Sequence, residues 1–361
     1  MRIEIDYDRA AYILQTLRKV RQENQFPYFL PEVIPPQIPE RMPKGLVIGS
    51  PDHVSVLFNS CLIMRGTINS QTAMQQMYRL WEAHRRPFFD PREAMKMDEE
   101  WAKEILWESG VRYNHKQNAG FWIKNAEKLC EYWEGNLLKL FEGAITYEEA
   151  YHRMIRNNGS PYGFYGFRHK MASLLIYFLT WFSLIDRYSF PFPADFQVSR
   201  LFITNGVFRF IDYDGQSNLY AEPFLGEMRK LSLWFEKEYG VDGLEQSDIF
   251  WLFASTMCEH NPGNRRRMHP GDYSSESRRV YRGRKVRFIE DLPEEFPGED
   301  KLKWTWRDVR EYNRYCRFCP LRETCTLNMP WAYHYRQGRM RPAGEREKPP
   351  VNNLDLFDSA M

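Results

Sequence analysis

The sequence predicts an all-α protein. Between about residues 50 and 258, apolar side chains recur at steps of three and four, the spacing that gathers them on one face of a helix. Breaks that contain glycine or proline separate these segments, and only residues 207 to 214 alternate enough to predict a short strand. The predicted helices cover Val54–Trp81, Glu99–Glu108, Phe121–Trp133, Tyr147–Ile155, His169–Leu184, Phe196–Phe202 and Glu227–Tyr239.

The segments on either side of this helical core, residues 50–258, lack its pattern. Residues 1–49 are predicted to form an irregular arm, with a short helix at Ala10–Gln22 followed by a proline-rich stretch that favours extended backbone. Residues 259–315 form a basic insertion and 316–341 a cysteine-containing loop. Residues 342–361 are polar, and we expect them to be disordered.

Size and charge limit the classes of protein to consider. With 361 residues the chain can bury a substantial core without help from a metal. Its net charge is only +2, so any affinity for nucleic acid must come from local clusters of basic residues. No stretch approaches the roughly 20 apolar residues of a membrane span, and the N-terminal sequence MRIEIDYDRA has no secretory core. We therefore expect a cytoplasmic monomer that does not associate with membranes.

Three clustered cysteines indicate a metal centre. Cys316, Cys319 and Cys325 stand in the sequence CRFCPLRETC, and thiolates at this spacing can converge on one centre from a tight loop. In a cytosolic protein, clustered cysteines suggest metal or redox chemistry before disulfides.

A fourth ligand must come from elsewhere in the chain. Cys61 and Cys130 lie in apolar helical runs, where a free cysteine usually acts as a small hydrophobic side chain. Cys258 ends the helical segment DIFWLFASTMC and is free to project from it, so it is the predicted fourth ligand. Four cysteines suit an iron–sulfur cluster or a structural zinc ion, and a single CxxC with one distant cysteine favours the cluster over zinc.

Four segments precede these cysteines in a characteristic order. They read LFNSCLIMRGTINSQTAMQQMYRLWE, ESGVRYNHKQNAGFWIKNAEKLCEYWEGNL, PYGFYGFRHKMASLLIYFL and FPFPADFQVSRLF. Together with the cysteine spacing, they resemble the helix-hairpin-helix (HhH-GPD) superfamily of DNA glycosylases that carry an endonuclease III-type iron–sulfur loop. The interleaved glycines and aromatic residues of the third segment are closer to the archaeal 8-oxoguanine glycosylase group. The chain departs from the family in the 57 residues between Cys258 and Cys316, which are normally a few residues apart.

The resemblance implies a helical bundle of two subdomains that flank an active-site cleft. It also implies a [4Fe–4S] cluster, held by the four cysteines named above, that shapes a DNA-facing loop at a distance from the chemistry.

Two residues match catalytic positions of the family. Asp195 corresponds to the catalytic aspartate, and cleavage of an N-glycosidic bond needs a carboxylate because positive charge develops on the sugar. The alternative for Asp195 is a plain N-cap of the following helix. Lys170 corresponds to the lysine that attacks the sugar in members with lyase activity, for which burial near Arg168 and His169 would have to depress its pKa. The alternative for Lys170 is contact with phosphate or solvent.

DNA contacts are predicted at the hairpin and in the insertion. The backbone amides near Gly163 and Gly166, together with Arg168, would hold a phosphate, while the aromatic neighbours would either wedge into the base stack or fill the core. The insertion could follow phosphates, or it could be a solvated loop paired with the acidic run Glu290 to Asp300. Its basic cluster between residues 265 and 287 comprises Arg265, Arg266, Arg267, Arg278, Arg279, Arg282, Arg284, Lys285 and Arg287.

The sequence therefore predicts a base-excision DNA glycosylase that acts on a modified base, a purine by the resemblance, in duplex DNA. One alternative is a glycosylase of a modified nucleotide or RNA base in salvage. Another is a non-catalytic iron–sulfur protein that binds nucleic acid in a DNA modification or defence system.

Overall fold

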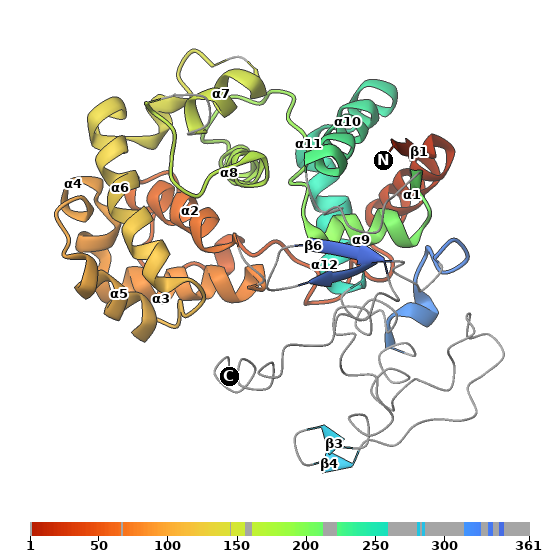
Figure 1. The fold of residues 1–361 in the computed structure, drawn as a ribbon, viewed down its shortest axis with the longest axis horizontal. Coiled ribbons are helices and arrows are strands. Elements are labelled where there is room, and N and C mark those ends of the chain that lie inside the picture. Colours follow the sequence, from red (N-terminus) through yellow and green to blue (C-terminus); the bar gives the residue numbers. More distant parts are fainter. Residues whose placement is uncertain are drawn as a thin grey trace. The chain divides into compact units, whose positions relative to one another are not determined.

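The computed structural model describes residues 2–65, 68–144, 146–155, 161–211, 222–258 and 314–325. It also gives the backbone of four short strands at 280–281, 284–285, 331–334 and 339–342. The described residues are mostly helical, which confirms the predicted all-α class at this level (Figure 1). None of the described helices is both long and apolar enough to cross a membrane.

The chain divides into two compact units. Unit 1 comprises the described residues of Met1–Ile34, Ala194–Phe235 and Asp248–Met361, and unit 2 comprises those of Pro35–Pro193 and Glu236–Ser247. The predicted N-terminal arm, residues 1–49, thus divides between the units after Ile34. The reason is long-range pairing: strand β1 (Arg2–Ile5) joins strand β2 (Phe208–Ile211) in an antiparallel pair. The local composition of residues 1–49 does not indicate that β1 pairs with β2.

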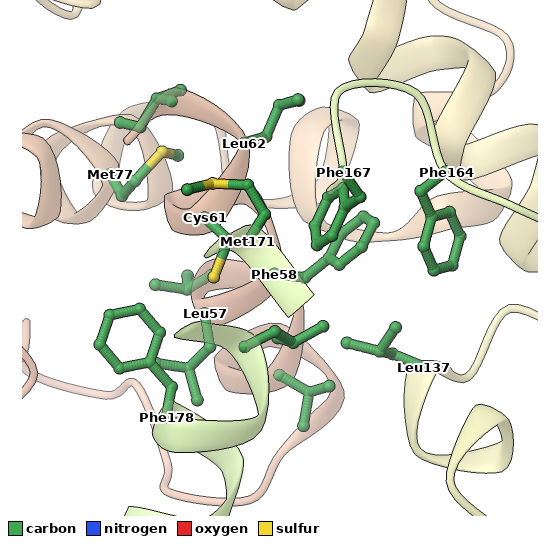
Figure 2. Packing of buried hydrophobic residues seen from close by; sticks show 14 of the residues in the cluster. Leu57, Phe58, Cys61, Leu62, Met77, Leu137, Phe164, Phe167, Met171 and Phe178 are labelled. Carbon is green, nitrogen blue, oxygen red and sulfur yellow. The ribbon is translucent and has the colours of Figure 1, made fainter. Parts of the chain in front are cut away.

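Unit 2 is a group of helices around α2 (Pro51–Ile63), whose residues from His53 to Ile63 are almost all buried. Ser50 caps α2 and Asn69 caps α3, so the predicted helix at Val54–Trp81 is in fact two helices. Figure 2 shows side chains of α2 and α8 meeting in the core. The other helices are α3 (Ser70–Phe89), α4 (Pro91–Ala94), α5 (Glu99–Glu108), α6 (His115–Trp133), α7 (Tyr147–Met154), α8 (His169–Trp181) and α11 (Gly243–Gln246).

Unit 1 packs three aromatic rings at its centre. The ring centroids of Phe202, Phe235 and Phe250 lie 5.1 to 6.1 Å apart. Arg21 and Asp248 add an ion pair of 2.7 Å. The elements are β1, α1 (Tyr7–Gln22), α9 (Phe196–Thr204), β2, α10 (Glu222–Tyr239, whose last residues belong to unit 2), a π-helical turn (Ser247–Trp251, whose first residue belongs to unit 2), α12 (Leu252–Thr256) and the 3₁₀ helix Cys316–Phe318.

Two predictions fall largely outside the described residues. In the basic insertion, residues 259–315, the structure describes the backbone pair of β3 (Val280–Tyr281) with β4 (Arg284–Lys285) and the last two residues, Arg314 and Tyr315. The polar tail after Pro342 lies outside them altogether.

Candidate functional site

Asp195 is the N-cap of α9 in unit 1. Its Oδ1 accepts a hydrogen bond from the Val198 amide at 2.9 Å, and its side chain is buried, with 7% of the residue exposed. The extended proline segment before it ends at Pro193 and delivers the chain to the helix start. Among the described residues, no donor reaches Oδ2. The capping role therefore uses only Oδ1 and leaves Oδ2 able to interact with another group.

Lys170 is the second residue of α8 in unit 2. Its Nζ lies 3.4 Å from the carbonyl oxygen of Met64, the residue that follows α2. A helix C-terminus attracts cations because its last carbonyls lack partners within the helix. This contact with a backbone carbonyl was not among the roles predicted for Lys170, and it uses only one of the three donors of the ammonium group.

The turn before α8 is built around Gly166, whose φ is +82°. Asn125 holds this turn in place: its Oδ1 accepts from the Tyr165 amide at 2.7 Å, and its Nδ2 donates to the Tyr165 carbonyl at 3.1 Å. The Phe164 amide donates to the Met154 carbonyl at 2.8 Å. Two amides that were expected to hold a phosphate are thus used within the protein. Among the side chains that the structure describes, none caps the first turn of α8, where Arg168 stands exposed at the N-cap position.

The aromatic residues of this turn divide between core and surface. Phe164 and Phe167 are buried against Phe58 of α2, as Figure 2 shows, with ring centroids 4.8 and 5.0 Å from it. These two side chains therefore fill the core and are not available as wedges. Tyr162 is 41% exposed and Tyr165 is partly buried.

Replacing Gly166 by alanine is expected to destabilise the protein by about 1–3 kcal/mol. A Cβ at this position would stand 2.9 Å from Nη1 of Arg65 and 3.0 Å from Cδ1 of Leu62, at a φ that L side chains rarely adopt. Gly143→Ala is the matched control, because Gly143 also has a positive φ, +67°, but open space around it. Urea unfolding should show a larger loss for Gly166→Ala. Equal losses would mean that the contact with Arg65 has no effect.

The four predicted metal ligands all belong to unit 1. Cys258 and Cys316 are buried, with 8% and 7% exposed, and Cys319 and Cys325 are partly buried. Backbone turns shape the loop: the Cys319 amide donates to the Cys316 carbonyl at 3.1 Å, and the Cys325 amide to the Leu321 carbonyl at 3.0 Å. Cys61 and Cys130 belong to unit 2, where Cys61 is fully buried in the core around α2 (Figure 2).

Three of these thiols act on one another electrostatically. Burial, and then the neighbouring Cys325, raise the pKa of Cys319 to about 12. Burial also raises the pKa of Cys258 well above its ordinary value, with further contributions from Cys325 and Cys319. The thiols thus share one buried neighbourhood, in which negative charge is unfavourable without a cation.

The chemistry of the donor set fits a metal centre, since four thiols belong to one unit and Cys319 and Cys325 both raise the pKa of Cys258. The positions of these side chains do not form a metal site: within the described residues, no three His, Cys, Asp or Glu side chains are close enough together to hold a metal ion. The pKa effects and the separation of the thiols are compatible, because the electrostatic interaction between two thiols acts over a longer distance than a metal–ligand bond.

The cysteine loop is attached to the helix that Asp195 opens, a link that the sequence did not reveal. Asn205, at the C-terminal end of α9, accepts a hydrogen bond from Oγ1 of Thr324 at 2.7 Å. Phe318 packs edge-on against Phe26 at 6.0 Å, on the other side of the loop. A distortion of the loop would therefore be transmitted to α9.

The side chains of the basic insertion that were predicted to contact DNA lie outside the described residues, although Arg284 and Lys285 have backbone positions in β4. Sequence reasoning overlooked another cation, Arg65, which lies beside the turn at Gly166. The signal that could have revealed it is the absence of Asp and Glu from residues 53–81, 109–126 and 150–185.

Comparisons with known proteins add no assignment: no protein-family model and no curated protein matches this chain significantly.

Proposed function

We propose that this protein is a DNA N-glycosylase that removes a modified base, with a purine as the first candidate. The observation that carries the proposal is Asp195, a buried carboxylate at a helix start with one oxygen committed to the cap and the other without a donor among the described residues. Such a group can stabilise positive charge on the sugar as the glycosidic bond breaks. Its capping bond fixes the carboxylate before substrate arrives, which limits the reorganisation that the reaction requires.

In the proposed reaction the bond between C1′ of the sugar and the base nitrogen breaks, and the base leaves with the bonding electron pair and takes up a proton. Water attacks C1′ and loses its own proton, so the products are a free base and an abasic site. Oδ2 of Asp195 faces the positive charge during this step, and Oδ1 remains on the Val198 amide. Asp195 forms no covalent bond to the sugar in this reaction, because water attacks C1′.

The metal centre is assigned a structural role in this proposal. Cys258, Cys316, Cys319 and Cys325 would hold a [4Fe–4S] cluster, with zinc as the alternative ion. When bound, this group would tie the loop at 314–325 to the end of α12 and neutralise the charge of the thiolates. The Thr324–Asn205 hydrogen bond then supports the position of α9 from the loop side.

The proposal is tested by incubating the purified protein with duplexes that each contain one modified base, followed by alkali treatment and gel electrophoresis. Strand cleavage at the modified base supports the proposal, with 8-oxoguanine and other modified purines as the first substrates. A protein that binds the duplexes but cleaves none of them would instead be a non-catalytic binder. Cleavage only of a free nucleotide or of RNA would assign the activity to salvage.

Lys170 provides a second route, in which its amine attacks C1′ in place of water and lyase activity follows. If Lys170 is the nucleophile, borohydride reduction should trap a covalent protein–DNA adduct on an active substrate. The Lys170→Ala variant should lose this adduct. Lys139→Ala, which removes a lysine ion-paired to Glu134, should keep it. Base release without any trapped adduct would contradict the amine route and leave water as the nucleophile.

A further inference from the structure

Acidic residues are absent from three segments of unit 2. The chain has 48 Asp and Glu residues, but none occurs in residues 53–81, 109–126 or 150–185. Elsewhere in unit 2, several cations are paired with carboxylates, for example Lys103 with Glu99 at 3.0 Å and Arg85 with Asp52. Positive charge without acidic neighbours is thus concentrated in particular segments, a distribution that needs a physical explanation.

Arg65 stands where these three segments meet. Its Nη2 donates to Oδ1 of Asn118 at 2.7 Å and to Oε1 of Gln117 at 3.1 Å, both in the first turns of α6, and its Nε donates to the Leu62 carbonyl at 3.0 Å. Its Nη1 lies on the other side, beside Gly166 of the turn before α8. The helices α2 and α6 pack against each other in unit 2 (Figure 1). Arg65 is therefore held firmly between α6 and the glycine turn.

The charge on Arg65 is not balanced within the described part of the chain. Its hydrogen-bond acceptors among the described residues are all neutral, and none of the described carboxylates lies within ion-pair distance of it. Burial lowers the pKa of its guanidinium, which means that holding the charge in this place costs free energy. A partly buried cation of this kind is stabilised when an anion arrives.

Aromatic rings link Arg65 to further cations, because its guanidinium lies 4.7 Å from the centre of the Phe121 ring, which is itself 5.6 Å from the centre of the Tyr165 ring. Lys124 of α6 lies 5.4 Å from the centre of the Tyr165 ring, and the guanidinium of Arg112 lies 5.2 Å from the Trp107 ring. Lys116 is exposed in the first turn of α6. We define the Arg65 surface as the following residues of unit 2: Arg65, Trp107, Arg112, Lys116, Lys124 and Tyr165.

We propose that the Arg65 surface binds the phosphodiester backbone of nucleic acid across several consecutive phosphates. The cations are held by different elements, the end of α2, the loop before α6 and two turns of α6, so they suit a chain of phosphates better than a single anion. The aromatic rings beside Arg112 and Lys124 suit unstacked bases or sugars. This inference rests on the proposed function only in choosing DNA as the nucleic acid.

The test measures binding of an unmodified DNA duplex by fluorescence anisotropy at several salt concentrations. Arg65→Gln, Arg112→Gln and Lys116→Gln should each weaken binding and reduce the slope of log affinity against log salt by about one. Lys103→Gln is the matched control on neighbouring α5 and should bind like the unaltered protein, because Lys103 is already paired with Glu99 and Glu100. Slopes unchanged in all three variants, or no duplex binding by the unaltered protein, would overturn the proposal.

Arg112 and Lys116 are exposed, so their variants remain informative if loss of the Arg65 hydrogen bonds prevents folding. The outcome is also separable from that of the proposed function, because an unmodified duplex offers no base to excise. Reduced slopes without base release by the unaltered protein would support the surface and reject the glycosylase. Base release with unchanged slopes would support the glycosylase and reject the Arg65 surface.

Discussion

Asp195→Asn is expected to reduce base release by about 100-fold or more, because the variant removes the charge that stabilises the sugar in the transition state. Asparagine is as good an N-cap as aspartate, so the hydrogen bond to the Val198 amide can persist. We therefore expect the stability to change by no more than about 1 kcal/mol. The measurement is a single-turnover rate of base release, with thermal unfolding of the same sample.

Asp98→Asn is the matched control for this substitution. Asp98 caps α5 in the same way, accepting from the Trp101 amide at 2.9 Å, and has no role in the proposed reaction. Its rate of base release should equal that of the unaltered protein. If Asp195→Asn and Asp98→Asn were equally active, Asp195 would be only a helix cap.

Cys258→Ala is expected to abolish most of the metal content and the visible absorbance of the purified protein. A site with four thiolate ligands loses much of its affinity when one is removed, and metal binding contributes directly to folding. We also expect a lower temperature of unfolding, because the loop at 314–325 would lose its link to the end of α12. Metal analysis by mass spectrometry decides between iron with sulfide and zinc.

Cys130→Ala serves as the control, since Cys130 is a partly buried thiol of α6 in unit 2. It should keep the metal and the colour. Cys61→Ala would be a poorer control, because removal of this fully buried thiol leaves a cavity in the core and destabilises the fold. Full metal content in Cys258→Ala would mean that another residue supplies the fourth ligand.

Local signals predicted the helices well. Helix α5 begins and ends where the periodicity places it, Glu99–Glu108, because Asp98 supplies the cap and the apolar spacing is regular. Asp195 was expected to open a helix and does so, since the cap depends on neighbouring residues alone. The predicted helix at Val54–Trp81 was wrong in its continuity: the apolar spacing runs on, but the side chain of Asn69 caps a new helix there.

Contacts between distant residues could not be predicted in the same way. The pairing of β1 with β2 joins segments about two hundred residues apart, so composition predicted an arm that wraps the main domain but not this strand pairing. The burial of Phe164 and Phe167 depends on Phe58, which periodicity does not connect to them. The cysteine spacing suggested a ligand set, and the structure brings the sulfur of Cys258 under the electrostatic influence of Cys319 and Cys325 without bringing the thiols to one point.

The central claim is that the protein breaks an N-glycosidic bond with the help of Asp195. It is tested most directly by identifying the products from a duplex with one modified base, using liquid chromatography and mass spectrometry on both base and strand. The account predicts free base and abasic site in equal amounts with the unaltered protein, and at least about 100-fold less of both with Asp195→Asn. No free base from any modified duplex, or the same yield from Asp195→Asn, would contradict it.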